Sequence, residues 1–364
     1  MADRVVLHIG TMKSGTTYLQ AVLTSGALDA VGGFYPGGRF EEQSVAVRRM
    51  LRPEHERDRT PWLALVDEVH ARPGVAVFSQ EFLSFARRRR VRQIVEPFGT
   101  TPIDVVLTVR DQRTAIPSQW QSFTRNRGTD DLATYVRRLS GPGGRRTSKA
   151  LMSFRRAQDV PQILRRWTSP EAVRSVSVVV LPPPGSAPAE LWRRFCDAAG
   201  LEVHDPPDAA VPANESLGYA SCDALRRVNA HLLDLDRDSY RRARDLVLGG
   251  LLPLRAAEGR PELDRDGLAL AADLNRAVVE AISSPGVRVV GSLDDLPVDP
   301  PAEGPATIAA PDEGEVLRAL EAAWAAALPR QAPPSGGVEE VADRLGRSLA
   351  QRFGPAPRQE PAGT

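Results

Sequence analysis

Lysine is almost absent from this chain. Only Lys13 and Lys149 among its 47 basic residues are lysine, so the other 45 are arginine. This bias, together with many Ala, Pro and Gly residues, is typical of a GC-rich bacterial genome. Because the bias explains most of the arginines, a single arginine is weak evidence for a site. A retained lysine is stronger evidence, and Lys13 lies in a polar turn close to the N-terminus.

Cysteine, net charge and long apolar runs are also scarce. Cys196 and Cys222 lie far apart without C-x-x-C spacing, which excludes a disulfide framework and a cysteine zinc site. No histidine pair has metal-ligand spacing either, so we expect no metal. A net charge of +1 predicts no nucleic-acid or membrane partner. The apolar runs are too short to span a membrane and no signal-peptide pattern is seen, so we expect a cytoplasmic protein.

Short runs rich in valine and isoleucine predict the strands of a sheet. They are apolar throughout rather than alternating, and they cover residues 5–9, 75–78, 104–109, 176–181 and 287–290. Continuous apolar strands are typical of parallel sheets that are covered on both faces. Segments with helical spacing lie between them. The sequence therefore predicts a three-layer, P-loop-like α/β fold with a central, mainly parallel sheet.

The composition changes towards the C-terminus, where Pro and Ala dominate "VDPPAEGPATIAAPDE". This stretch is typical of a linker, and two helical patterns follow it. We therefore expect four parts: a domain over 1–298, a linker over 299–312, a helical C-terminal extension over 313–353 and a disordered tail over 354–364.

The segment "HIGTMKSGTTYLQ", residues 8–20, follows the first predicted strand. A strand, a turn rich in Gly and Thr, and then a helix form a common phosphate site, because backbone N–H groups and the positive helix end face the anion. We expect Gly10 and Gly15 to let the backbone approach the phosphate, and Thr16 and Thr17 to donate hydrogen bonds. Lys13 supplies a compact positive charge.

The order of residues in this segment differs from a Walker A loop. That motif reads G-x-x-x-x-G-K-[ST], whereas here Lys13 precedes the second glycine in K-S-G-T-T. No predicted strand ends in a clear magnesium-binding aspartate. A P-loop nucleotide phosphotransferase and a non-catalytic nucleotide-binding protein are therefore retained as alternatives only.

A second segment, "VVLTVRDQRTAIPSQW", residues 105–120, has the composition of an anion site. Arg110 ends a buried strand and so faces the ligand crevice of a parallel sheet. Its guanidinium group can bind a phosphate through two hydrogen bonds. Ser118, eight residues later, can donate to the same group. A surface arginine that caps the strand is the simpler structural explanation, and Arg113 is an alternative to Arg110.

Together these segments resemble the donor site of sulfotransferases that use 3′-phosphoadenosine 5′-phosphosulfate. "TMKSGTTYLQ" is similar to the family's 5′-phosphosulfate loop, and a strand-end arginine with a serine eight residues on is similar to its 3′-phosphate site. The resemblance implies that Arg110 and Ser118 bind the 3′-phosphate. It also implies that the 5′-phosphosulfate is bound by Lys13, Ser14, Gly15, Thr16 and Thr17.

The resemblance covers residues 3–297 and implies a reaction. A sulfuryl group would pass to a hydroxyl or amine of a small-molecule or carbohydrate acceptor, leaving adenosine 3′,5′-bisphosphate, without a metal. Lys13 would stabilise charge on the leaving oxygen. The R-K-G loop that adds 3′-phosphate contacts in animal cytosolic members is missing, and Asn214 and Ser216 are candidates to replace it.

Sulfuryl transfer needs a base for the acceptor's proton. Glu81 follows the strand in "VAVFSQEFLSF", residues 75–85, and carbohydrate-directed members of the family use a glutamate, so we expect Glu81 to be the base. The alternatives are His8, which is expected to be a hydrogen-bonded core histidine, and Asp111, which is expected to pair with Arg110 or to accept hydrogen bonds at a helix start.

Four consecutive arginines, residues 87–90, come shortly after Glu81. A basic run of this kind usually forms the solvated face of a helix. The alternative is that it binds an acceptor with several negative charges.

Overall fold

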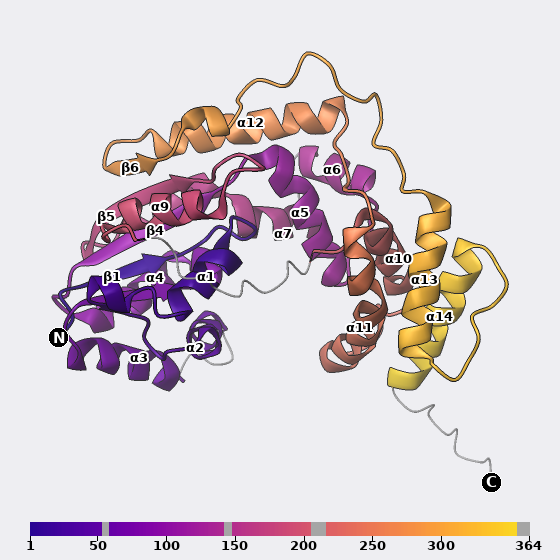
Figure 1. Cartoon of the computed structure of the whole chain (residues 1–364), viewed down its shortest axis with the longest axis horizontal. Coiled ribbons are helices and arrows are strands. Elements are labelled where there is room, and N and C mark those ends of the chain that lie inside the picture. The colour runs from indigo at the N-terminus through magenta and orange to yellow at the C-terminus, as the bar shows by residue number, and fades with distance from the viewer. Residues whose placement is uncertain (53–57, 142–147, 205–215, 355–364) are drawn as a thin grey trace, which may run out of the picture. The chain divides into compact units, whose positions relative to one another are not determined.

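The computed structural model describes residues 1–52, 58–141, 148–204 and 216–354. Residue Asn214 and the predicted tail beyond 354 lie outside these ranges. The strands of the described chain form one six-stranded sheet in the order β2-β3-β1-β4-β5-β6, and every neighbouring pair is parallel. Figure 1 shows helices packed along this sheet. The predicted α/β fold with a mainly parallel sheet is confirmed.

All five predicted strands are present. The strands are β1 (Arg4–His8), β2 (Gly33–Phe34), β3 (Val75–Ser79), β4 (Ile103–Val109), β5 (Val173–Val180) and β6 (Val287–Val290). The sequence did not predict β2, because two residues are too few to show a periodic pattern. It also placed the start of β5 too late, because the first residues of that strand are partly or fully exposed and break the apolar run.

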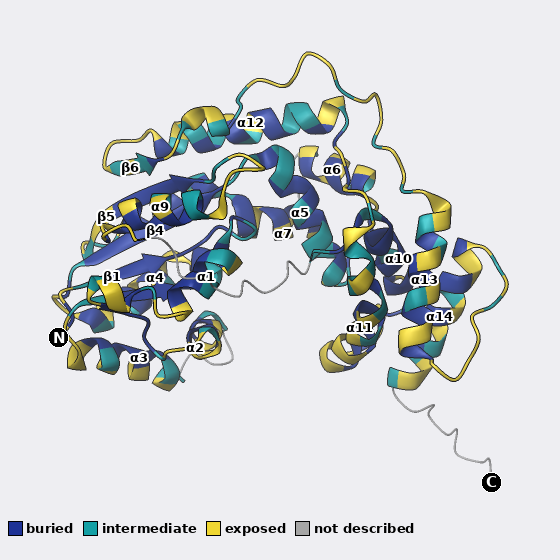
Figure 2. Ribbon diagram, viewed as in Figure 1, coloured by how far each residue is buried: buried dark blue, intermediate teal, exposed yellow. Residues whose placement is uncertain are grey.

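The two faces of the sheet are covered by different helices. In β1, Val5 and Leu7 belong to one buried cluster and Val6 to the other, because successive strand residues point to opposite faces. Three layers result, and the strands are buried between the helices (Figure 2). The first face packs against α2 (Phe40–Leu51), α3 (Thr60–Ala71), α4 (Arg88–Val95), α8 (Val160–Trp167) and α12 (Arg265–Ile282). The second packs against α1 (Thr16–Thr24) and α9 (Pro188–Ala199).

The chain divides into two compact units. One takes in Met1–Ala115, Leu151–Asn214 and Leu268–Ala302, and it contains the sheet. The other takes in Ile116–Ala150, Glu215–Gly267 and Glu303–Thr364. The remaining helices are α5 (Gln112–Arg125), α6 (Leu132–Ser140), α7 (Lys149–Gln158), α10 (Tyr219–Asn229), α11 (Arg237–Leu251), α13 (Glu313–Ala327) and α14 (Val338–Phe353). Short 3₁₀ helices are η1 (Asp29–Val31), η3 (Glu81–Phe85), η4 (Glu96–Phe98), η5 (Leu252–Ala256) and η6 (Leu293–Asp295).

The second unit is helical. The expected C-terminal helices are confirmed as α13 and α14, and they pack against α10 and α11. A Cβ atom at Gly250 of α11 would lie 2.2 Å from the carbonyl oxygen of Ala322 in α13, so these two helices approach closely. Helices that precede the predicted linker thus pack with the extension, whereas the predicted domain and linker boundaries remain predictions. None of the helices in the described ranges is long and apolar enough to cross a membrane.

Candidate functional site

Three predicted site segments follow three neighbouring strands. β1 lies between β3 and β4, and all three run in the same direction. The loop of residues 9–15 follows β1, Glu81 follows β3 after one residue, and Arg110 follows β4 directly. The chain crosses from one side of β1 to the other between β3 and β4, and ligands of open parallel sheets bind at such a reversal of strand order. The fold therefore gathers these segments at one edge of the sheet (Figure 1).

The loop after β1 has an unusual backbone. The φ angle is 82° at Gly10, 63° at Lys13 and 75° at Gly15. Within the described ranges, Lys13 and Arg127 are the non-glycine residues with a positive φ. A left-handed backbone costs a side-chain-bearing residue about 1–2 kcal/mol. Left-handed residues in a turn also bring successive N–H groups to one side, which forms an anion-binding concavity. A strained lysine at such a turn points to a functional requirement.

The two glycines of the loop are needed for packing as well as for their φ angles. A Cβ atom at Gly10 would lie 2.7 Å from Cβ of Glu81, and one at Gly15 would lie 2.4 Å from Cδ2 of Leu191. We expected these glycines to make room for a phosphate. Protein atoms occupy the space that a side chain would fill, so Gly10 is what allows Glu81 to lie against the loop, and the approach of a phosphate to these glycines stays a prediction.

The N-terminus of α1 is open. Gly15 is its N-cap and has no side chain to cap the helix, and the first turn has no acidic residue. Among the described residues, none accepts a hydrogen bond from the N–H groups of Gly15, Thr16 or Thr17. The side chain of Thr17 is exposed, whereas Thr16 is buried. The positive end of the helix dipole and these N–H groups can therefore bind an anion.

Buried hydroxyl groups connect the loop to the ends of β3 and β4 through hydrogen bonds. Ser14 Oγ donates to the carbonyl of Thr11 at 2.5 Å and lies 2.6 Å from Thr108 Oγ1. His8 Nε2 lies 3.2 Å from Thr108 Oγ1, and His8 Nδ1 lies 2.7 Å from Ser79 Oγ. The side chain of Ser14 thus points into the core, and only its backbone N–H is left to face a ligand.

The direction of each hydrogen bond in this chain follows from the first one. Because the proton of Ser14 is used on a carbonyl, Thr108 must donate to Ser14 Oγ. Thr108 Oγ1 then accepts from His8 Nε2–H, and Ser79 donates to His8 Nδ1. Complete burial lowers the pKa of His8 to about 3, so the ring is neutral. The expected core histidine is confirmed, and both ring nitrogens are engaged, which argues against His8 as the base.

Glu81 is held by a residue of the loop's own helix. Gln20 Nε2 donates to Glu81 Oε2 at 2.9 Å and to the carbonyl of Ser79 at 3.2 Å. No donor in the described part of the chain reaches Oε1 of Glu81, which leaves that oxygen available to a substrate. Sequence reasoning missed Gln20. Its position could have identified it, because Gln20 lies one helical turn after Thr16 on the same face of α1.

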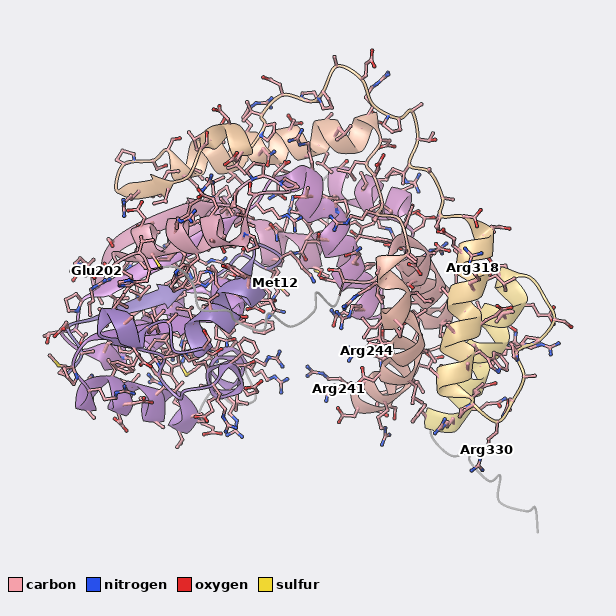
Figure 3. All side chains as sticks on the ribbon, in the orientation of Figure 1. Met12, Glu202, Arg241, Arg244, Arg318 and Arg330 are labelled. Atoms are coloured by element: carbon pink, nitrogen blue, oxygen red, sulfur yellow. The ribbon has the colours of Figure 1, made fainter. Side chains whose placement is uncertain are left out.

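Arg110 reaches the loop. Its Nη1 donates to the carbonyl of Lys13 at 3.1 Å, and its Nε donates to Thr114 Oγ1 at 2.7 Å. Gln158 of α7, which sequence reasoning also missed, donates to the carbonyl of Met12 at 2.7 Å. Met12 is labelled in Figure 3. In a trans peptide the N–H points opposite to the carbonyl, so these two donors help to orient the N–H groups of the loop.

Arg113 is engaged elsewhere. Its Nε pairs with Asp111 Oδ2 at 2.8 Å, and its backbone N–H donates to Asp111 Oδ1 at 3.0 Å. Asp111 thus accepts hydrogen bonds at the helix start, as expected, but its arginine partner is Arg113 rather than Arg110. Ser118 lies on α5 in the part assigned to the second unit, so its predicted place beside Arg110 remains a prediction.

Comparison with known proteins does not indicate a family, so the site is interpreted from its residues alone. No family model, curated protein or solved structure matches the chain. In the described ranges, no group of three or more His, Cys, Asp or Glu side chains is arranged to hold a metal ion.

Proposed function

We propose that the protein is a sulfotransferase that moves a sulfuryl group from 3′-phosphoadenosine 5′-phosphosulfate to a hydroxyl or amine of a small-molecule or carbohydrate acceptor. The strongest support is that the K-S-G-T-T loop, Glu81 and Arg110 lie together at one edge of the sheet. An anion-binding turn, a carboxylate and a guanidinium group are thereby combined in a single site.

The groups of the chain fit the charges of this donor. The open N–H groups of Gly15, Thr16 and Thr17, with the charge of Lys13, would hold the 5′-phosphosulfate. Arg110 would hold the 3′-phosphate together with the predicted Ser118. The donor, when bound, supplies an activated sulfuryl group.

The residues then have distinct roles in the transfer. Glu81 accepts the proton of the acceptor through Oε1, while Gln20 keeps Oε2 in place. The bond from the acceptor atom to sulfur forms as the bond from sulfur to the 5′-phosphate oxygen breaks, and the electron pair stays on that oxygen. Lys13 and the N–H groups of the loop stabilise the charge that develops there.

Calorimetric titration tests the choice of donor. We expect adenosine 3′,5′-bisphosphate to bind without magnesium and ATP to bind poorly, because ATP lacks the 3′-phosphate. Arg110→Ala should weaken bisphosphate binding and raise the donor KM. Arg113→Ala is the matched control, because it removes the same charge from a side chain that pairs with Asp111. Magnesium-dependent ATP binding without bisphosphate binding would overturn the proposal.

A further inference from the structure

Several arginines of the chain pair with a carboxylate. Arg4 and Arg174 both pair with Asp104, and Arg194 pairs with Asp295. By contrast, no carboxylate of the described residues lies within 4.0 Å of the guanidinium groups of three arginines that surround η3. These are Arg87, Arg156 and Arg166, which we call the arginine cluster.

The charge of Arg87 acts on both other guanidinium groups of the cluster. Burial lowers the pKa of Arg156, and the charge of Arg87 lowers it further. Burial likewise lowers the pKa of Arg166; Asp159, at the start of α8, opposes this shift and Arg87 adds to it. Arg87 therefore lies near enough to one arginine of α7 and one of α8 for its charge to act on both. Like charges held together without a paired carboxylate destabilise a fold unless an anion compensates them.

The cluster is attached to the short helix that begins with Glu81. Arg166 Nη2 donates to the carbonyl of Ser84 at 3.1 Å. The guanidinium of Arg156 lies 4.4 Å from the ring centre of Phe85. On the neighbouring ring of Phe82, Arg48 of α2 lies 4.6 Å from the centre. Arginines thus line the same 3₁₀ helix that carries the proposed base.

Stacking on an aromatic ring suits a guanidinium group for anion binding. The ring covers the flat face of Arg156, while the N–H donors point outward in the plane of the group. Although Arg156 is partly desolvated, it keeps much of its surface accessible to solvent, and so does Arg87. Two or more such forks can share one tetrahedral or planar anion through charge-assisted hydrogen bonds.

We propose that the arginine cluster binds an anionic group of the acceptor, a sulfate, phosphate or carboxylate carried in addition to the atom that receives the sulfuryl group. The assignment of this anion to an acceptor rests on the proposed function. In this proposal the negative charge of the acceptor binds near the end of η3 that is opposite to Glu81. The proposal also gives a function to Arg87, the first residue of the basic run at residues 87–90.

Protection from an arginine-specific reagent tests the cluster without knowledge of the acceptor. The full chain is treated with phenylglyoxal, and the rate at each arginine is followed by peptide mass spectrometry. At roughly ten times its dissociation constant, inorganic sulfate should slow the reaction of Arg87, Arg156 and Arg166 about tenfold. Arg155, exposed and next to Arg156 on α7, is the internal control and should not be protected. Phosphate and acetate at matched ionic strength identify which anion is preferred.

Variants test whether the protection depends on the arginine cluster itself and not on how readily a surface arginine reacts with phenylglyoxal. In the double variant Arg87→Gln/Arg156→Gln, sulfate should no longer protect Arg166, whereas Arg155→Gln should leave that protection intact. Absence of protection by all three anions, or equal protection of Arg155, would overturn the proposal. Adenosine 3′,5′-bisphosphate should protect Arg110 in the same experiment. Failure of that signal alone counts against the proposed donor and leaves the anion site standing.

Discussion

Lys13 carries its charge on a left-handed backbone, and mutation can separate these two properties. Lys13→Ala and Lys13→Gly both remove the charge, so we expect kcat to fall by about 10²–10³-fold in each. Glycine also removes the penalty of the positive φ angle. The free energy of unfolding of Lys13→Gly should therefore exceed that of Lys13→Ala by about 0.5–1 kcal/mol. Urea unfolding measures this difference, and equal stabilities would contradict the strained loop.

Glu81 can accept a proton only while it is ionised. Glu81→Gln keeps the size of the side chain and an oxygen that can accept from Gln20, but it removes the carboxylate that we propose as the base. Turnover should fall by about 10²-fold or more, while calorimetry should show unchanged binding of the bisphosphate. Gln20→Ala, the comparison variant, should lower turnover less, because the carboxylate remains. Near-parental kcat in Glu81→Gln would move the role to another residue, with Asp111 the next candidate.

His8 makes the stability of the protein depend on pH. Its pKa is about 3 in the folded state and 6.5 in the unfolded state, so between these values the unfolded chain binds more protons. The free energy of unfolding should therefore fall as the pH falls below 6.5, by up to about 1.4 kcal/mol per pH unit. Between pH 7 and pH 5, the parent should lose about 2 kcal/mol more than His8→Gln. Denaturant unfolding at both pH values measures this, and the same loss in both proteins would refute it.

At the scale of elements, the junction between the loop and α1 depends on Gly15. Gly15→Ala places a side chain on a positive φ and against Leu191. Gly32→Ala is the matched control, because its φ is 63° and no atom lies within 4 Å of the added Cβ. We expect a loss of about 1 kcal/mol for the control and about 1–3 kcal/mol more for Gly15→Ala. Equal losses in thermal or urea unfolding would mean that Leu191 adapts freely.

Single strands were easier to predict from the sequence than the side chains that hold the site loop in place. β1, β3 and β4 are buried along nearly their whole length, so their apolar runs stand out in the sequence. Gln158 has no such pattern, because it comes from a separate helix and reaches Met12 only through the tertiary fold.

At the scale of the whole molecule, α13 and α14 complete the second unit. Leu320 of α13 and Leu345 of α14 are fully buried, and Gly250 of α11 packs closely on α13. Truncation after residue 302 should therefore abolish hydrogen-exchange protection in α10 and α11, while amides of the β-sheet keep theirs. Truncation after residue 354 is the control and should change neither. Protected α10 and α11 in the shorter protein would show that the extension is dispensable.

The sequence by itself determined the class of fold and the positions of three candidate site segments. Apolar runs, the K-S-G-T-T turn and a strand-end arginine are local patterns, and each can be read from neighbouring residues. Because all the strands run in parallel, the ends of β1, β3 and β4 then have to meet at one edge of the sheet. The convergence of Lys13, Glu81 and Arg110 therefore needed little beyond the strand order.

Only the tertiary structure decided how these residues are held. Gly10 is required because Glu81 packs against it, Arg110 rather than Arg113 reaches the loop, and the tautomer of His8 follows from hydroxyl groups on two other strands. Such contacts join residues separated by 70 positions or more along the chain. These contacts depend on strand register and on which side chain forms a hydrogen bond with each buried donor or acceptor. Neither property is encoded in a local stretch of sequence.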